Sequence, residues 1–176
     1  MFERLIATAS QTIGPYWHLI EHTEMADLLR FGATGDAITI SGRLTDGAGQ
    51  LIADAAVEIW QSSPAASDTF PAYGRCCTDA AGQFAFRTLK PGAVAGLGNA
   101  QQAPHLALTI MARGLLTALT TRLYFQDEPL NDTDPVLSLI DDPARRATLI
   151  ARPTAPDAWH LEIRLQGENE TVFMEI

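Results

Sequence analysis

The sequence predicts an all-β protein, a single-domain β-sandwich with short helical insertions. Many short segments alternate apolar and polar side chains, and turns rich in Gly, Asp or Pro separate them. The chain has 176 residues, the length of one ordinary domain, and such a domain buries roughly 70% of its unfolded surface. Short strands with this punctuation are typical of two packed sheets.

The predicted strands follow one another along most of the chain. Residues 37–44 alternate apolar with small polar side chains, and residues 46–49 (Asp-Gly-Ala-Gly) then supply a turn. Residues 79–82 (Asp-Ala-Ala-Gly) separate two further segments, which indicates a hairpin. The predicted strands cover residues 37–44, 56–60, 75–78, 83–87, 105–112, 120–125, 159–165 and 171–176.

Two short helices are predicted between the last strands. Residues 134–140 and residues 142–150 each open with Asp-Pro, an acidic N-cap followed by proline in the first helical turn. No repeat, linker or low-complexity tract interrupts the chain. We therefore expect one domain over residues 1–176.

The N-terminal part of this domain predicts an extended arm over about residues 1–36. Gly14-Pro15 disfavours regular helix and favours an extended or turning path. Residues 25–31 could form one or two helical turns before Gly32.

Composition excludes several classes of function. The net charge is −9 and the pI is about 4.7, which makes nucleic acid or a membrane surface a poor partner because phosphates require basic patches. The chain shows neither a long apolar run nor a leader-like N-terminus. Its two cysteines, Cys76 and Cys77, are adjacent and poorly placed to bridge each other, so we expect a reducing, cytoplasmic location.

Short catalytic motifs do not name a reaction. The sequence has no phosphate loop, nucleophile elbow or zincin helix. His18 and His22 have the spacing of helical metal ligands, but Gly14-Pro15 just upstream favours solvated side chains. The Cys76-Cys77 pair is a weak zinc signal and fits a strand better. His160 alternates with apolar residues and should face solvent or an interface.

Several stretches together resemble the intradiol ring-cleaving dioxygenases. They occur in the family's order and spacing across almost the whole chain, which makes the match more specific than any single motif. The stretches are Ser10-Gln-Thr-Ile-Gly-Pro-Tyr16, Glu58-Ile-Trp-Gln61, Gly74-Arg-Cys-Cys-Thr-Asp79, Arg87-Thr-Leu-Lys-Pro-Gly92, Ala103-Pro-His105, Thr121-Arg-Leu-Tyr-Phe125 and Arg164-Leu-Gln-Gly167.

The resemblance implies a β-sandwich, in agreement with the strand pattern, and a reaction. Enzymes of this family use Fe(III) and O2 to open a dihydroxylated aromatic ring between its two hydroxylated carbons. The branch that this chain resembles acts on protocatechuate, giving 3-carboxy-cis,cis-muconate in aromatic catabolism by the β-ketoadipate pathway. It pairs an iron-binding β chain with a homologous iron-free chain in an obligate αβ assembly, commonly in higher oligomers.

The same resemblance assigns the iron to the partner chain. The family's ligands are two tyrosines and two histidines, and the matching positions here are Val94, the tyrosine-free residues 62–70, His105 and Ala107. The family's arginine before the first histidine is replaced by Gln102. His105 alone cannot hold a ferric ion. The resemblance therefore implies no catalytic and no metal-binding residue in this chain.

A substrate-binding role remains for five positions. The matching residues of the family line one wall of the substrate pocket: Thr12, Gly14, Pro15, Tyr16 and Arg113. Protocatechuate carries a ring carboxylate, and a guanidinium binds carboxylate strongly and often through two hydrogen bonds. We expect Arg113, which lies at a strand end before glycine, to make that contact.

Two other classes of function stay open on sequence grounds. A β-sandwich can be a non-enzymatic binding or carrier module, because fold alone does not specify function. The chain could also be a self-sufficient metalloenzyme with unrecognised ligands such as His18 and His22. Metal analysis and co-purification with an iron-binding homologue discriminate among these possibilities.

Overall fold

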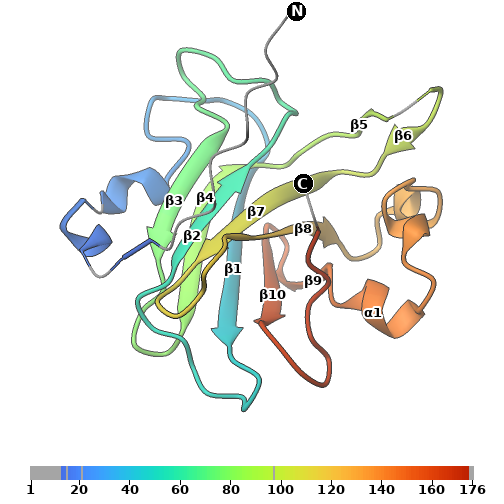
Figure 1. Cartoon of the computed structure of the whole chain (residues 1–176). Helices are drawn as coiled ribbons and strands as arrows, with labels where there is room; N and C mark the ends of the chain where they lie inside the picture. The colour runs from blue at the N-terminus through green and yellow to red at the C-terminus, as the bar shows by residue number, and fades with distance from the viewer. Residues whose placement is uncertain (1–12, 15, 21, 97, 175–176) are drawn as a thin grey trace, which may run out of the picture.

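The fold is known from a computed structural model, which describes residues 13–14, 16–20, 22–96 and 98–174. These residues are mostly β-strand, with short helical pieces (Figure 1). The strands are β1 Ala37–Thr45, β2 Ala56–Trp60, β3 Tyr73–Cys77, β4 Gln83–Leu89, β5 Val94–Ala95, β6 Gln101–Gln102, β7 His105–Met111, β8 Leu119–Phe125, β9 Ile150–Ala155 and β10 Ala158–Arg164. The predicted all-β class is confirmed.

One sheet of eight strands forms both layers of the sandwich. Its order is β3-β2-β7-β8-β9-β10-β1-β4, and β5 pairs separately with β6. The pairs β8–β9 and β1–β10 are parallel, and the other pairs are antiparallel. β3 and β4 end the order on opposite sides although a tight turn joins them, so the sheet folds back over itself (Figure 1).

The core lies between the two halves of this folded sheet. Strand alternation directs every second side chain inward, as in β4, where Phe84 and Phe86 are buried between exposed neighbours. Ile40 and Leu161 meet this core from one half, and Leu108 from the other. Burial of about 1.5–3 kcal/mol per large side chain makes this cluster the main stabilising feature.

A second, smaller core covers the outer side of β8. Tyr124 and Leu137 are fully buried there with Ala103 and Leu149. The covering segment holds two 3-10 helices, η3 Pro129–Asp132 and η4 Leu137–Leu139, and one α-helix, α1 Pro143–Ala147.

The predicted helices are present in shortened form. Residues 134–140 make only the single turn of η4, because Asp134 accepts hydrogen bonds from the backbone amides of Val136 and Leu137 and is buried rather than a surface cap. Asp142 caps α1 as expected, accepting from the amide of Ala144 at 2.8 Å. α1 ends at Ala147 because the chain turns and enters β9, a strand that the sequence analysis missed.

The N-terminal segment contains two helical turns in its described part. η1 Trp17–Ile20 and η2 Thr23–Ala26 are 3-10 helices, so this part is less extended than expected. η2 packs on β3, where a Cβ on Gly74 would lie 2.5 Å from Leu28 and 2.7 Å from the carbonyl of Met25. That close approach requires glycine.

At the other end of the chain, the predicted strand 171–176 is reduced to one bridge, between Met174 and Thr120; residues 175–176 lie outside the described part. Among the described residues no helix has both the length and the apolar character needed to cross a membrane.

Candidate functional site

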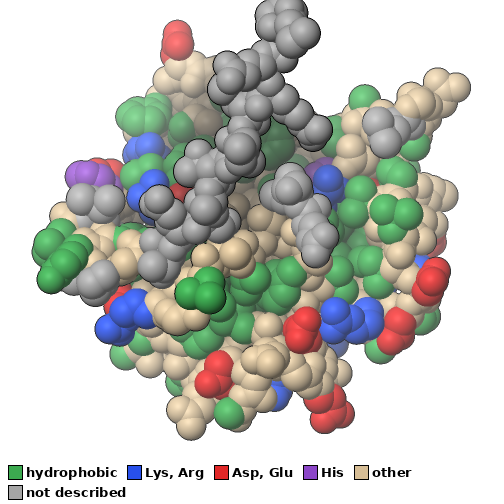
Figure 2. Space-filling view, in the orientation of Figure 1, with side chains coloured by type: hydrophobic (Ala, Val, Ile, Leu, Met, Phe, Trp, Pro, Cys, Tyr) green, Lys and Arg blue, Asp and Glu red, His purple; other side chains and the backbone are tan. Residues whose placement is uncertain are grey.

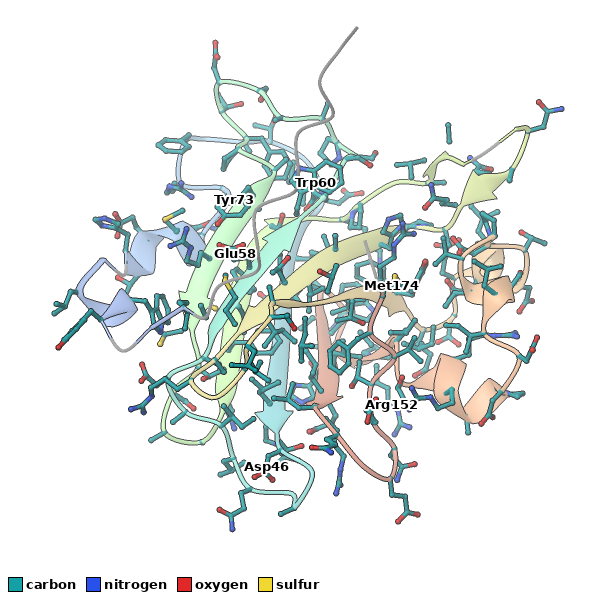
Figure 3. All side chains as sticks on the ribbon, viewed as in Figure 1. Asp46, Glu58, Trp60, Tyr73, Arg152 and Met174 are labelled. Atoms are coloured by element: carbon teal, nitrogen blue, oxygen red, sulfur yellow. The ribbon has the colours of Figure 1, made fainter. Side chains whose placement is uncertain are left out.

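The outer face of β3, β2, β7 and β8 carries His105 and Ala107, two positions that the sequence analysis matched to the family's iron ligands. The register places Trp60 between Tyr73 and Ala107, and Ala107 next to Arg122. Trp60 is 51% exposed, so about half of its large apolar side chain faces solvent. Figure 3 shows Trp60, Glu58 and Tyr73 along the same β2–β3 pair.

The first described residues of the chain lie against this face. Gly14 has a φ of 75° with open space around it, so the left-handed backbone rather than crowding favours glycine there. Trp17 is buried, whereas the neighbouring Tyr16 is 72% exposed. Thr12 and Pro15 lie outside the described residues.

A cavity separates this segment from the sheet. It has a volume of about 640 Å³, and its lining residues are Ile13, Tyr16, Trp17, Glu58, Arg75 and Met111. Tyr16 therefore presents an aromatic ring to both the cavity and the solvent.

Arg113 is tied to the same segment through Asp54. Its guanidinium Nη2 lies 3.1 Å from the Asp54 carboxylate, and its side chain is 65% exposed. The backbone carbonyl of Asp54 accepts a hydrogen bond from the indole of Trp17 at 3.3 Å. Asp54 has a φ of 66°, in the left-handed region. The fold thus brings Arg113 close to the aromatic residues of the N-terminal segment, with guanidinium donors left toward solvent.

Two of the cavity's lining residues, Glu58 and Arg75, form a polar triad with Tyr73, which the sequence analysis did not find. The Tyr73 hydroxyl donates to Glu58 Oε1 at 2.6 Å, and Arg75 Nε donates to the same oxygen at 3.1 Å. Burial, and then the hydrogen bond to Glu58, raise the pKa of Tyr73, so the phenol stays protonated. Glu58 and Arg75 are direct cross-strand neighbours, a relation that only the β2–β3 register reveals.

His105 lies at the start of β7, and one of its ring nitrogens carries no proton. Its Nδ1 contacts the Ala103 carbonyl at 2.7 Å and donates to it, which leaves Nε2 unprotonated in the neutral ring. Burial lowers the pKa of His105, and Arg122 lowers it further, against an opposing effect of the backbone hydrogen bond. Ala107, two residues along β7, and Val94 on β5 offer no ligand atom.

The polar groups next to His105 satisfy one another. Arg122 Nη1 donates to Gln102 Oε1 at 2.7 Å and to the Tyr124 hydroxyl at 3.1 Å. Tyr124 donates in turn to Asp134 Oδ1 at 3.3 Å. Burial raises the pKa of Tyr124 to about 12. The Tyr124 phenol is therefore neutral and hydrogen-bonded to Arg122 and Asp134, and it is not a phenolate that could bind a metal.

Asp134 closes this network. It is fully buried and accepts from the amides of Ala103, Val136 and Leu137 at 2.7–2.9 Å. Each of its two oxygens already accepts at least one hydrogen bond. The residues at this position do not fit a ferric ion, which needs several oxygen and nitrogen ligands, and no step of a reaction can be derived through a metal held here.

The other candidate ligands are dispersed in the described part of the chain. No group of three or more His, Cys, Asp and Glu side chains gathers there. His22 is exposed and lies 3.5 Å from Glu24. His160 contacts the Ser41 hydroxyl at 2.9 Å and Glu162 at 3.1 Å on the opposite half of the sandwich.

Comparison with known proteins identifies the family. Residues 14–166 match the family profile described as Dioxygenase, and the fold matches an intradiol ring-cleavage dioxygenase from Tetranychus urticae with a TM-score of 0.60, at 17% identity over 94% of this chain and 98% of that one. The chain belongs to the intradiol dioxygenase family.

Individual relatives match this chain to different extents. The chain is 38% identical to the protocatechuate 3,4-dioxygenase alpha chain of Pseudomonas putida, covering 98% of both chains. It is 37% identical to the alpha chain of Burkholderia cepacia, covering 96% of this chain and 97% of that one. The Burkholderia cepacia beta chain is 30% identical over 63% of this chain and 54% of its own length. The dioxygenase domain of a Streptomyces sp. SirexAA-E fusion protein superposes with a TM-score of 0.63 at 28% identity, covering 90% of this chain and 97% of that one.

Proposed function

We propose that this chain is the iron-free α subunit of a heteromeric protocatechuate 3,4-dioxygenase and works with a homologous iron-binding β chain. Two observations support this most. Over nearly its whole length the chain is similar to alpha chains. At the positions that the resemblance matches to the family's iron ligands, Val94 and Ala107 carry no ligand atom, and the Tyr124 hydroxyl near His105 is bonded to Asp134.

The proposed reaction opens protocatechuate between its two hydroxylated carbons and inserts both atoms of O2, giving 3-carboxy-cis,cis-muconate. A ferric ion on the partner chain would supply the Lewis-acid and template chemistry. This chain would bind, orient and enclose the substrate.

Arg113 is the proposed carboxylate contact. It is exposed and lies in the turn two residues after β7. Its Nη2 contacts Asp54, and the remaining guanidinium donors face outward. A planar fork of donors matches a carboxylate. Tyr16 and Gly14, with Thr12 and Pro15, would form the wall that excludes water from the ring, in keeping with the exposure of Tyr16.

Surface chemistry supports an obligate partner. Large apolar side chains are exposed in the described residues, and Figure 2 shows hydrophobic side chains at the surface on the side of the molecule that it draws. The large apolar side chains that are exposed are Tyr16, Leu19, Phe31, Leu51, Trp60, Leu116 and Leu139. Obligate interfaces commonly bury more than about 2,000 Å² and are rich in such side chains. A cytoplasmic location in the β-ketoadipate pathway completes the proposal.

The decisive experiment expresses the chain alone, a homologous β chain alone, and both together. We expect no stoichiometric iron in the isolated chain, and iron, a burgundy colour and protocatechuate cleavage in the complex. Near-equimolar iron that survives dialysis of the isolated chain would contradict the iron-free role. A stable assembly without any change in turnover would favour a binding module instead.

A further inference from the structure

A polar groove runs along the outer face of β9, β10 and β1, away from the substrate wall. Its volume is about 860 Å³, and α1, the turn at Gly49 and the loop at Asn169 border it. Small-molecule sites in proteins commonly measure about 300–1,000 Å³. Figure 3 shows Arg152, one of its lining residues, on the other side of the molecule from Glu58 and Tyr73.

The groove is basic although the chain is acidic. Arg43, Arg152 and Arg164 line it, and Glu162 is its one lining carboxylate among the described residues. Arg43 and Glu162 pair through two contacts of 3.0 Å. Two guanidinium groups therefore remain without a counter-charge, in a protein whose net charge is −9.

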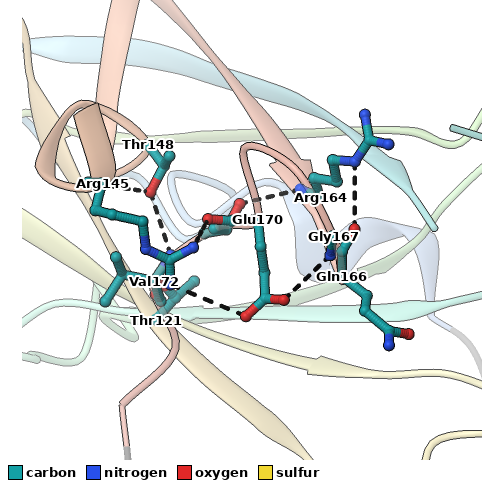
Figure 4. Close-up of polar contacts among 9 residues, drawn as sticks. Thr121, Arg145, Thr148, Arg164, Gln166, Gly167, Glu170 and Val172 are labelled. Carbon is teal, nitrogen blue, oxygen red and sulfur yellow. Dashed lines mark hydrogen bonds and ion pairs between the residues drawn. The ribbon is translucent and has the colours of Figure 1, made fainter. Parts of the chain in front are cut away.

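The two remaining arginines differ from others on the surface. Among the described residues the Arg152 side chain has no hydrogen-bond or ion-pair partner, whereas the Arg113 and Arg87 side chains each contact a carboxylate. The Arg164 guanidinium donates only to neutral carbonyls, of Gly47 at 2.9 Å and of Gln166 at 3.3 Å. Figure 4 shows the contact with Gln166.

The strand register places these two positive charges at opposite ends of the groove. Arg152 is paired with His160, and Arg164 with Thr45. His160 and Arg164 are four residues apart on β10, or about 13 Å along the strand. The Glu162 carboxylate lies between the ends and would repel an anion at the centre. A complementary ligand carries separate anionic groups at its ends.

We propose that this groove binds a small aliphatic anion with two or three carboxylate groups, held at its ends by Arg152 and Arg164. Guanidinium groups bind carboxylates through parallel hydrogen bonds, and two flexible arginine side chains can converge on one chain-like ligand. None of the exposed large apolar side chains lines the groove. Protein interfaces depend on such anchors, so a small ligand suits it better than a protein segment. The inference rests on the proposed function only in that its test uses the αβ assembly proposed above.

The test is calorimetric titration of the assembled αβ complex with tricarballylate, at low and moderate salt. We expect saturable binding that weakens with salt, and a Kd raised by about ten- to a hundredfold in Arg152→Ala and again in Arg164→Ala. Arg87→Ala serves as the matched control and should leave the Kd unchanged. Arg113→Ala should also leave it unchanged, which separates the groove from the substrate pocket.

A further variant distinguishes binding from structural damage. Glu162→Gln removes the central negative charge and releases Arg43, so tricarballylate should bind several-fold more tightly, roughly as expected for one screened charge. Unchanged affinity in both arginine variants would overturn the proposal, as would equal affinity for sulfate or acetate. A changed oligomeric state in Arg152→Ala without tricarballylate binding to the parent complex would assign the groove to a protein partner and refute the small-ligand inference.

Discussion

Two regions of the molecule differ in whether their polar side chains bond to one another or stay open to solvent. At the His105 position, Arg122, Tyr124 and Asp134 donate to and accept from one another within a buried cluster. At the N-terminal wall, Tyr16 and Arg113 stay exposed, and a single carboxylate contacts the arginine.

The difference teaches where this chain can contribute chemistry. Buried polar groups that satisfy one another stabilise structure but offer nothing to a ligand. Exposed groups held at one end by the fold are available to a partner or substrate. The closed cluster of Arg122, Tyr124 and Asp134 should therefore govern stability. The open wall, which holds Tyr16 and Arg113, should govern turnover.

The largest effect is expected from the closed cluster. In Asp134→Asn, an amide NH2 would face the amide N–H groups that the carboxylate now accepts. Loss of a buried charged acceptor should lower the free energy of unfolding by about 2–4 kcal/mol. Urea unfolding of the complex measures it, and Asp132→Asn, an exposed neighbour, is the control. Equal midpoints for the two variants would show that the cluster is not a stabilising unit.

The open wall should respond in turnover instead. Deleting residues 1–16 leaves Trp17 and its hydrogen bond to Asp54 in place. We expect the sandwich to stay folded by circular dichroism while protocatechuate turnover falls by about a hundredfold, because positioning and water exclusion are lost. Wild-type turnover in an assembled, truncated complex would remove the N-terminal segment from the pocket.

Most of the fold could be predicted because strand alternation and turn residues are local signals. β1, β2, β4, β7, β8 and β10 begin and end within two residues of the predicted segments. β9 was missed because Pro153 and the acidic cap at residue 142 both indicate something other than a strand. β9 tolerates proline because its register shifts beside β10 at Ala158–Trp159.

The site was less accessible to sequence reasoning. The resemblance pointed to Tyr16 and Arg113, but the contact that joins their segments passes through Asp54, which no motif marks. Tyr124 was noted within a family stretch, yet its bond to Asp134 depends on how a later loop folds over β8. Such relations require tertiary register, which one sequence does not contain.

Removing the single positive charge of Arg113 from the open wall should have the next largest effect, a loss of kcat/KM. Arg113→Ala should lower kcat/KM for protocatechuate by about ten- to a hundredfold, since a charge-assisted hydrogen bond contributes roughly 1.5–3 kcal/mol. The loss should fall on substrate binding, because the carboxylate is the same in ground and transition states.

Catechol provides the control for that variant, since it has no carboxylate and its slow cleavage should change little. Arg113→Lys should restore part of the effect, because lysine lacks the planar fork. The free energy of unfolding should stay within about 0.5 kcal/mol, because exposed ion pairs contribute little. A variant that treats both substrates as the wild type does would make Arg113 an ordinary surface residue.

The smallest effect is a pH dependence that belongs to the closed cluster. Burial lowers the pKa of His105 in the folded chain below its ordinary value of 6.5, so the unfolded chain takes up a proton first as the pH falls. The contribution of His105 to stability is therefore full above pH 6.5 and declines as the pH drops from there through the folded pKa.

In His105→Asn the amide can still donate to the Ala103 carbonyl that His105 now contacts, but it does not titrate. The free energy of unfolding of both proteins is measured by chemical denaturation between about pH 7.5 and pH 5, a range that brackets the titration of an ordinary histidine. It should fall more steeply with decreasing pH in the wild type. Arg122→Gln should reduce that slope, because the guanidinium also lowers the pKa of His105. Parallel stability curves for wild type and His105→Asn would mean that His105 carries its proton as readily in the folded chain as in the unfolded one, and that the cluster is more open to water than its burial indicates.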